Sequence, residues 1–187
     1  MAQIREALGD SPYIIYLGGP QPRKRFEWAL ELLAQCGRED VHLVACGFGA
    51  GTAALDKIPA ALRHRVHIAP FVEDGELATL YRGALAALYP TLYEGFGFPA
   101  VEAQAAGTPI IFSPVSSLVD LVGPLTWVAD AQDFTAWCKA LREILALPDH
   151  ARQDLAVQGK EWARQFSWRR SVERHFDVYR DVLEHTR

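Results

Sequence analysis

The most constraining feature of this sequence is a repeated alternation between short, continuously apolar runs and segments with helical periodicity. We expect the apolar runs, which are rich in β-branched and aromatic residues, to form strands at 13–17, 41–46, 66–71, 84–89, 109–112 and 125–128. We expect helices at 26–35, 52–62 (interrupted at Pro59), 74–83, 99–106, 131–147, 149–165 and 168–185. Strands that are apolar throughout and are each followed by a helix are typical of a parallel sheet covered on both faces. The sequence therefore predicts an α/β fold: a Rossmann-like, doubly wound parallel sheet of about six strands with helices on both faces and a helical C-terminal extension.

Length and composition fit one globular domain over residues 1–187. Hydrophobic residues make up 50% of the chain and charged residues 22%. The net charge of −4 argues against nucleic acid as a partner. No run approaches the roughly 18–20 apolar residues of a membrane span, and the first ten residues do not resemble a signal peptide. We expect Cys36, Cys46 and Cys138, which have no metal-site spacing, to be reduced core residues of a cytoplasmic protein.

Three glycine-rich segments follow predicted strands, at 18–19, 47–51 and 95–97. Ligands of doubly wound sheets bind beyond the carboxyl ends of the strands, so we expect all three segments on one rim. The middle segment, CGFGAG, is not the dinucleotide fingerprint G-x-G-x-x-G, because Thr52 stands in place of the third glycine. It also follows the second strand, whereas that fingerprint follows the first.

The segment from 89 to 109 is the most informative. Glu94 lies on the loop after the fourth strand, and Gly95 and Gly97 allow a close backbone approach to a ligand. Pro99 opens a helix whose free N–H groups favour an anion, and Glu102 is expected in its first turn. A phosphate on these N–H groups would lie between the two glutamates, which could each accept hydrogen bonds from hydroxyl groups. The structural alternative is a common loop followed by a glutamate that stabilises the helix dipole.

A basic segment, 18–26, follows the first strand. Arg23, Lys24 and Arg25 suit a diphosphate, and the alternative is a solvated basic turn. His42, His64 and His67 lie on separate predicted elements, so we interpret them as surface or strand residues rather than metal ligands. The five tryptophans are expected to pack the core; they are Trp28, Trp127, Trp137, Trp162 and Trp168.

The run LYEGFGFPAVEAQAAGTPII strongly resembles the donor-binding motif of the retaining glycosyltransferases of family 4, which have the two-domain GT-B architecture. YLGGPQPRKRFEWALELL is similar to the first strand and phosphate loop of that family. VHIAPFVEDGELATLYRGALAALYP resembles the segment before the donor site, and FSWRRSVERHFDVYRDVL resembles the C-terminal helix. The resemblance covers about residues 13–183. It implies the donor-binding half of a glycosyltransferase, which binds a nucleotide diphosphate sugar.

The resemblance also implies roles for individual residues. Glu94 matches the glutamate that contacts the transferred sugar, Glu102 the one that holds the ribose, and Lys24 the lysine that contacts the diphosphate. Val72 stands where main-chain atoms meet the base. Main-chain N–H groups approach the sugar and the diphosphate at Gly95, Phe96, Gly97 and Phe98. Gly19 replaces an arginine found in many members, so Arg23, Arg25, Lys24 or the helix start must then balance the diphosphate charge.

The resemblance implies transfer of a hexose with retention of anomeric configuration, without a metal ion or other cofactor. Glu94 and Lys24 are the expected catalytic residues. FSPVSSLVDLVG faintly resembles mannosyltransferases that use GDP-mannose, and a UDP-sugar is the alternative donor. The acceptor is expected to be a glycan or lipid-linked intermediate of polysaccharide biosynthesis.

Two-domain members of the family are about twice as long as this chain, which resembles only the donor-binding domain. The acceptor-binding domain is expected to be missing, so the chain alone is expected to be inactive or weakly active. Three alternatives remain: a separate donor domain, one subunit of a split transferase, or a non-catalytic nucleotide-binding or interaction module. We also expect the C-terminal helix to expose an apolar patch that favours self-association. The basic, aromatic stretch 162–170 could contact the inner face of a membrane.

Overall fold

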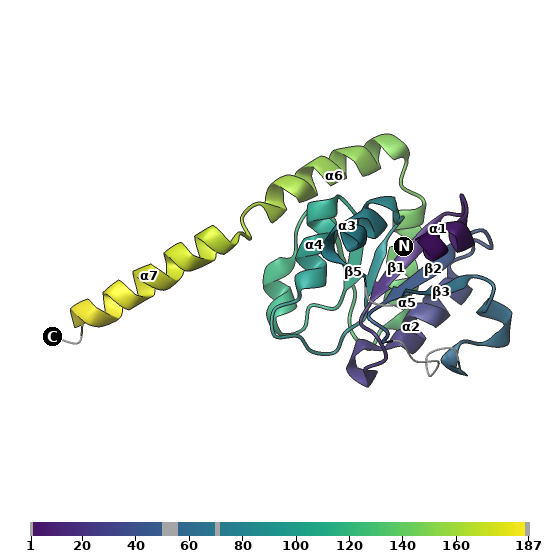
Figure 1. The fold of residues 1–187 in the computed structure, drawn as a ribbon, viewed down its shortest axis with the longest axis horizontal. Helices are drawn as coiled ribbons and strands as arrows, with labels where there is room; N and C mark the ends of the chain where they lie inside the picture. Colours follow the sequence, from purple (N-terminus) through teal and green to yellow (C-terminus); the bar gives the residue numbers. More distant parts are fainter. Residues whose placement is uncertain (1, 50–55, 70–71, 186–187) are drawn as a thin grey trace.

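The computed structural model describes residues 2–49, 56–69 and 72–185 and forms an α/β fold around one parallel sheet (Figure 1). The six strands lie in the order β3-β2-β1-β4-β5-β6, and every neighbouring pair is parallel. Their bounds are β1 Tyr13–Leu17, β2 His42–Cys46, β3 Val66–Ile68, β4 Ala87–Tyr89, β5 Ile110–Phe112 and β6 Thr126–Val128. The predicted fold class is therefore confirmed.

Helices cover both faces of the sheet, as parallel strands require. The α-helices are α1 Ala2–Leu8, α2 Phe26–Gln35, α3 Asp74–Gly83, α4 Phe98–Ala106, α5 Phe134–Leu145, α6 Asp149–Ala163 and α7 Trp168–His185. The short 3-10 segments are η1 Pro22–Lys24, η3 Ala60–Leu62 and η4 Ser116–Leu121.

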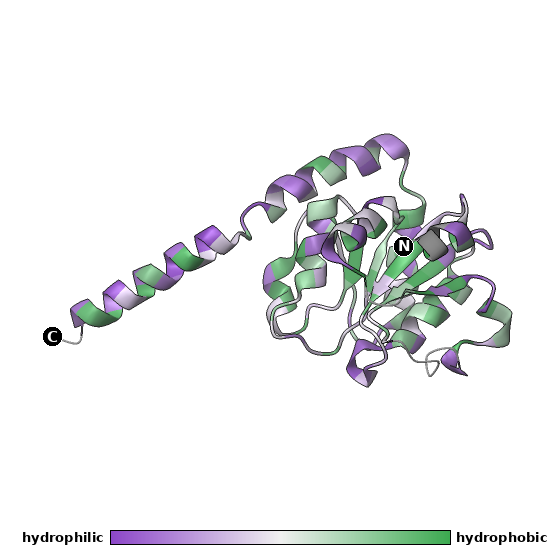
Figure 2. Ribbon diagram, in the orientation of Figure 1, coloured by the Kyte–Doolittle hydropathy of each residue, from purple (hydrophilic) through white to green (hydrophobic). Residues whose placement is uncertain are grey.

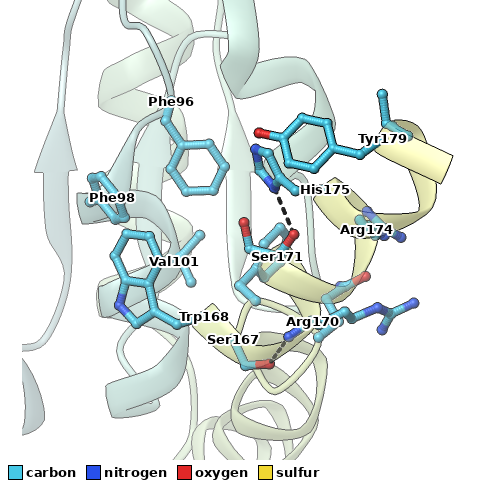
Figure 3. A pocket seen from close by; sticks show the side chains of 13 residues that line it. Phe96, Phe98, Val101, Ser167, Trp168, Arg170, Ser171, Arg174, His175 and Tyr179 are labelled. Atoms are coloured by element: carbon cyan, nitrogen blue, oxygen red, sulfur yellow. Dashed lines mark hydrogen bonds between the residues drawn. The ribbon is translucent and has the colours of Figure 1, made fainter. Parts of the chain in front are cut away.

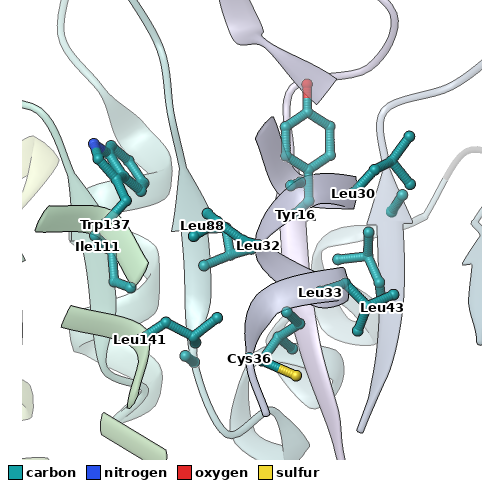
Figure 4. Close-up of a cluster of buried hydrophobic side chains, with 14 of the residues drawn as sticks. Tyr16, Leu30, Leu32, Leu33, Cys36, Leu43, Leu88, Ile111, Trp137 and Leu141 are labelled. Carbon is teal, nitrogen blue, oxygen red and sulfur yellow. The ribbon is translucent and has the colours of Figure 1, made fainter. Parts of the chain in front are cut away.

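Alternate residues of the four central strands, β2, β1, β4 and β5, point into two separate hydrophobic cores. Ile14 and Tyr16 of β1 face α2 and α5, whose buried side chains include Leu33 and Trp137 (Figure 4). Ile15 faces the other way, into a core formed with α1, α3, α4 and η4. Because both faces of these central strands are buried, their sequences are largely apolar rather than alternating.

The sheet reverses its strand order between β1 and β4. The chain runs from β1 outward to β3, then crosses back to place β4 on the other side of β1, where Ile15 is in register with Ala87. The loops after β1 and β4 consequently leave the sheet side by side and then diverge. This is the topological switch point at which doubly wound sheets bind ligands.

The C-terminal helices differ in their contacts. Helix α6 packs along α4. Helix α7 projects away from the body of the domain and has no buried residue (Figure 1). Figure 2 shows polar and apolar residues alternating along α7, which marks it as amphipathic. Trp168, the first residue of α7, is 78% exposed, so the prediction that it packs the core is wrong.

Several predicted bounds differ from the structure. The strand predicted at 84–89 covers only Ala87–Tyr89, because Ala84 caps α3. The helix predicted at 52–62 is a 3-10 turn at Ala60–Leu62, and residues 52–55 lie outside the described part. The strand predicted at 66–71 ends at Ile68, and residues 70–71 also lie outside it. Helix α1 was not predicted, although Ile4 and Leu8 are spaced one turn apart and are buried.

The remaining side chains expected in the core are buried or partly buried. All three cysteines are free and buried, as predicted. Trp137 is completely buried, whereas Trp28, Trp127 and Trp162 are partly buried against the cores. Among the residues that the structure describes, no helix combines the length and the apolar character needed to cross a bilayer.

Candidate functional site

The centre of the site is an ion pair that joins the two loops of the switch point. Lys24 ends η1 on the loop after β1, and Glu94 lies on the loop after β4. The Nζ of Lys24 donates to Oε1 of Glu94, and both side chains are about nine-tenths buried. Arg23 Nη1 donates to the same oxygen at 2.9 Å and to the carbonyl of Tyr93 at 2.7 Å. The structure thus brings together the predicted residues Arg23, Lys24 and Glu94.

Two further groups hold this ion pair in position. The hydroxyl of Thr91, which is completely buried, donates to Glu94 Oε1 at 2.7 Å. The hydroxyl of Tyr89 lies 3.0 Å from Lys24 Nζ. Burial alone would raise the pKa of Glu94, but the hydrogen bonds from Lys24 and Thr91 outweigh it, so the pKa is lowered. Glu94 is therefore a negatively charged acceptor at neutral pH.

The loop after β1 is held against the loop after β2 by glycines. Gly19 has a positive φ of 61°, and a Cβ there would overlap the carbonyl oxygen of Gly47. The amide of Gly19 donates to the carbonyl of Cys46 at 3.1 Å, and the buried Tyr16 hydroxyl donates to the carbonyl of Gly19 at 2.9 Å. The contact between Gly19 and Gly47 confirms that these two glycine-rich segments share a rim. Residues 50–51 of the middle segment lie outside the described part.

The third segment leads directly into α4. Gly97, which precedes the helix, has a φ of 100°, a conformation that favours glycine. Among the described residues, the N–H groups of Gly95, Phe96 and Gly97 make no hydrogen bond within the protein. A Cβ at Gly95 would meet no protein atom within 4 Å. These N–H groups at a helix start are suited to hold an anion.

Two serines at the start of η4 clamp the Glu94 loop. The hydroxyl of Ser116 accepts from the amide of Glu94 and donates to its carbonyl, both at 3.0 Å. The hydroxyl of Ser117 lies 2.8 Å from the carbonyl of Phe96 and 3.2 Å from that of Glu94. Ser116 has a φ of 48°, an unusual conformation for a residue with a side chain. Such strained residues persist where the surrounding structure holds them, and here it fixes the loop between Glu94 and Gly97.

Glu102 lies on α4 beside Tyr81. Because α4 begins at Phe98 rather than Pro99, Glu102 is beyond the first turn, and that prediction is wrong. The Tyr81 hydroxyl lies 3.3 Å from Glu102 Oε2. Partial burial and the nearby carboxylate of Asp74 raise the pKa of Glu102. A helix-dipole role no longer explains this residue, since that effect fades beyond the first turn.

Four other residues named from the sequence take different places. Arg25 does not join the site: its guanidinium stacks on Trp28 and donates to the carbonyl of Ala131. Val72 lies just before α3, partly buried, two residues from the Asp74 carboxylate that acts on Glu102. Phe96 and Phe98 point their rings outward, and they are 39% and 54% exposed.

His42 and His67 lie apart from this rim. His42 begins β2 and its Nδ1 is 2.8 Å from Nε2 of His67 on β3, with the two rings stacked. Burial lowers the pKa of both, so each is neutral at neutral pH and one donates to the other. In the described parts of the chain, no three His, Cys, Asp or Glu side chains are grouped so that they could hold a metal ion.

The sequence did not identify Thr91, Tyr81, Ser116 and Ser117 as site residues. Only Thr91 carries a local signal, because it lies three residues before Glu94, within reach of its carboxylate. The two serines follow β5 and therefore leave the same edge of the sheet as Glu94. Tyr81 lies in α3 and reaches Glu102 only because α3 packs against α4.

A protein-family model described as "Glycosyl transferases group 1" matches residues 2–162. The O-antigen chain mannosyltransferase B of Escherichia coli is 30% identical over 90% of this chain and 45% of its own length. A sucrose-phosphate synthase from Thermosynechococcus elongatus has the same fold, with a TM-score of 0.80 and 28% identity over 99% of this chain and 49% of that one. Anabaena HepE, solved in complex with UDP-glucose, has a TM-score of 0.73 and 16% identity over 88% of this chain and 47% of that one. The chain thus spans less than half the length of the curated relatives that it matches.

Proposed function

This chain belongs to the group 1 glycosyl transferases, and we propose that it is the donor-binding half of a sugar transferase with a nucleotide diphosphate sugar as its donor. The observation that carries the proposal is the arrangement at the switch point of the sheet. There, Lys24 and Arg23 meet Glu94 beside the unbonded N–H groups that precede α4. Cations and a helix start suit a diphosphate, and a carboxylate suits sugar hydroxyls.

Each part of the donor has a matching group in this proposal. The diphosphate lies on the N–H groups of 95–98 and beside Gly19, with Lys24 and Arg23 supplying positive charge. The transferred sugar donates hydroxyl hydrogen bonds to Glu94, and the ribose donates to Glu102. The base lies against the main chain at Val72. The proposed positions of the sugar, the diphosphate, the ribose and the base thus run along the rim from the loop after β4 to the start of α3.

One oxygen of the Glu94 carboxylate is already engaged by three protein groups. Its Oε1 accepts from Lys24, Arg23 and Thr91. When the nucleotide sugar binds, its diphosphate competes with Glu94 for Lys24 and Arg23. Hydroxyl groups of the sugar then replace these two cations as hydrogen-bond donors to the Glu94 carboxylate. Before the donor arrives, the opposite charges keep Lys24, Arg23 and Glu94 together at the rim.

We propose transfer with retention of anomeric configuration. The bond between the anomeric carbon and the diphosphate oxygen breaks, and its electron pair leaves with the nucleoside diphosphate. The acceptor oxygen forms a bond to the anomeric carbon on the same face, and its proton passes to a phosphate oxygen. Lys24 stabilises the charge that develops on the leaving group, with no metal ion needed in this scheme.

The relatives suggest the class of donor and acceptor. One is named as a mannosyltransferase of O-antigen chains, and one fold neighbour was solved with UDP-glucose. We therefore propose GDP-mannose or a UDP-sugar as donor, and a glycan or lipid-linked intermediate of polysaccharide synthesis as acceptor. The three buried free cysteines fit a reducing compartment, and we propose a cytoplasmic location.

Acceptor recognition is assigned in this proposal to the part of the relatives that this chain does not match. The 187 residues alone would then bind donor but transfer slowly, because one half-site does not exclude water. If a second chain supplies the acceptor half, the two should co-purify when they are produced together. Failure to associate at micromolar concentration would argue against such a split enzyme.

A thermal-shift panel tests donor binding directly. UDP, GDP and ADP are each tested with and without their common sugars, in buffer with and without EDTA. A ligand at about 100 times its Kd adds about 2.7 kcal/mol of stability. This corresponds to about 5–10 °C in a domain of this size. We expect one base to shift the Tm, more with one sugar, and equally in EDTA; a flat panel would favour a non-catalytic module instead.

A further inference from the structure

The loop between β4 and α4 has different surroundings on its two sides. On one side, an apolar groove of about 950 Å³ lies between Phe96 and Phe98 and the first part of α7 (Figure 3). Neither Glu94 nor Lys24 lines this groove. On the other side, the loop meets the loop after β1, and a main-chain hydrogen bond of 2.9 Å joins the two loops. The contacts of the loop after β1 therefore place Lys24 beside Glu94.

Arg25, the residue after Lys24, has a left-handed backbone. Its φ of 55° and ψ of 54° lie in a region that a residue with a side chain adopts only at an energetic cost. Of the described residues other than glycine, only Ser116 also has a positive φ, and it holds the loop that carries Glu94. Such conformations persist where the surrounding structure holds them, and they cluster at functional sites. The surroundings of Arg25 must therefore offset the cost of its backbone.

The side chain of Arg25 is anchored away from Glu94. Its guanidinium lies 3.2 Å from the ring centroid of Trp28, and its Nη1 donates to the carbonyl of Ala131. Trp28 is itself held edge-on against Phe134 and Trp137 of α5, with ring centroids 5.2 and 5.9 Å away. Stacking on an indole ring and a hydrogen bond from a charged group are together large enough to hold a left-handed residue in place.

The left-handed conformation sends two consecutive side chains to different strands of the sheet. Lys24 reaches Glu94 on the loop after β4, whereas Arg25 reaches Ala131 on the loop after β6. Arg25 is also the residue at which η1 ends and α2 begins, with its amide bonded to η1 and its carbonyl bonded to α2. A different backbone conformation at this one residue would turn η1 relative to α2, and Lys24 would turn with it.

Lys24 has little room to compensate for such a turn. A Cβ at Gly18 would lie 2.7 Å from the Cβ of Lys24, so the stem of this lysine packs closely against the end of β1. The hydroxyl of Tyr16 lies 3.3 Å from its carbonyl. Because the stem is closely packed, the position of the Lys24 ammonium depends on the backbone of its loop.

We propose that Arg25 is a positioning residue of the donor site: its anchored side chain holds the left-handed backbone that directs the Lys24 ammonium to Glu94. Arg25 thus acts through Lys24, in place of the direct contact with a diphosphate expected from the sequence. The inference rests on the proposed function for the task of Lys24. The contact of Lys24 with Glu94, however, exists without a ligand, and it can be measured separately.

Substitutions of Arg25 separate the backbone conformation from the side chain. Arg25→Ala removes the anchor and keeps the cost of a left-handed backbone, so the loop should relax and Lys24 should leave Glu94. Arg25→Gly also removes the anchor, but glycine adopts this conformation readily, so Lys24 should stay. Arg25→Asn should resemble Arg25→Gly, because asparagine tolerates the left-handed region. Arg38→Ala, at an exposed arginine beyond the other end of α2, is the matched control for the lost positive charge.

The measurement is the pKa of the Glu94 carboxyl, followed by ¹³C NMR in the ligand-free, full 187-residue chain. Lys24 is one of the groups that lower this pKa. We expect Arg25→Ala to raise the proton affinity of Glu94 about tenfold. Arg25→Gly, Arg25→Asn and Arg38→Ala should each leave it within about twofold of the parent value. Arg25→Gln, which keeps the stem but not the guanidinium, should act like Arg25→Ala and serves where Arg25→Ala does not fold.

Two results would overturn the proposal. An unchanged pKa of Glu94 in Arg25→Ala or Arg25→Gln would show that Lys24 stays in place without the anchor, so that Arg25 only stabilises the fold. Equal increases in Arg25→Ala and Arg25→Gly would assign the effect to the lost side chain rather than to the backbone. Because no ligand is present in this measurement, a flat thermal-shift panel would contradict the proposed function without altering this result.

Discussion

At the scale of single residues, the site depends on which groups balance the negative charge of Glu94. Its carboxylate is largely buried, and it is kept charged by Lys24, Arg23 and Thr91. Glu102 has the opposite setting, since burial and Asp74 raise its pKa. Two carboxylates with such different surroundings are suited to different tasks.

Substitution of the two glutamates should separate these tasks. Glu94→Gln should weaken binding of the nucleotide sugar by about ten- to a hundredfold, the loss expected for hydrogen bonds to a charged group. It should leave the bare nucleoside diphosphate bound as tightly or more tightly, because Lys24 and Arg23 are released. Glu102→Gln should weaken both ligands. Calorimetric titration measures both affinities, and equal losses of the two ligands in Glu94→Gln would remove the sugar role from Glu94.

The raised pKa of Glu102 predicts a pH effect on stability. The folded protein binds this proton more tightly than the unfolded chain, so its contribution is present at low pH and is lost as the pH rises through the raised pKa. Glu102→Gln lacks this loss. We expect the Tm of the variant minus that of the parent to be more positive at about pH 7 than at about pH 3.5. The same difference at both pH values would contradict the assigned environment.

At the scale of elements, the site is made by loops that must be held close together. Gly19 and Gly47 allow the loops after β1 and β2 to touch, and η4 holds the loop after β4. The strands supply only the common edge. The rigid loops at that edge then determine whether Lys24, Glu94 and the N–H groups before α4 lie close enough together to bind one ligand.

Gly19→Ala should destabilise the fold more than an ordinary glycine substitution. Its positive φ costs about 1–2 kcal/mol with a side chain, and the overlap with the Gly47 carbonyl adds to this. Gly37→Ala is the control, because Gly37 has a φ of 78° but open space around it. Urea unfolding should give a clearly larger loss for Gly19→Ala; equal losses would show that the loop contact is not needed.

The serine clamp predicts a local effect. Ser116→Ala and Ser117→Ala remove hydrogen bonds to the main chain of Glu94 and Phe96, worth about 0.5–1.5 kcal/mol each. We expect faster hydrogen exchange at 94–97, weaker donor binding, and a Tm lowered by about 1–6 °C for each hydrogen bond lost. Ser11→Ala, at the opposite edge of the sheet, serves as the control. Unchanged exchange at 94–97 would leave the serines without a positioning role.

The sequence predicts the elements of this fold well, and the reason is physical. The central strands are buried on both faces, so their apolar runs are visible locally, and the bounds of β1 and α3 are as predicted. Errors occur where the local sequence does not determine the structure. Whether Glu102 lies in the first turn of α4, for example, depends on the helix starting at Phe98 rather than at Pro99. Contacts such as Ser116 with Glu94 join residues 22 positions apart, and no periodicity reveals them. Trp168 was misjudged because an amphipathic helix predicts an apolar face but not what covers it.

At the scale of the whole molecule, two features lie beside each other. The donor rim lies at the switch point between β1 and β4, and the groove beside α7 begins at Phe96 and Phe98 on the same motif loop. A partner that covers the groove would therefore lie next to the loop that holds Glu94.

The most direct test of the central proposal is an NMR titration of the ¹⁵N-labelled chain with the nucleotide sugar that gives the largest thermal shift. The account predicts that the largest amide shifts occur at Gly19, Gly95, Phe96 and Gly97, with smaller ones near Glu102 and Val72. Lys24→Ala should reduce these shifts at equal ligand concentration. Shifts confined to the α7 groove or to the far edge of the sheet would contradict the assignment of this rim as the donor site.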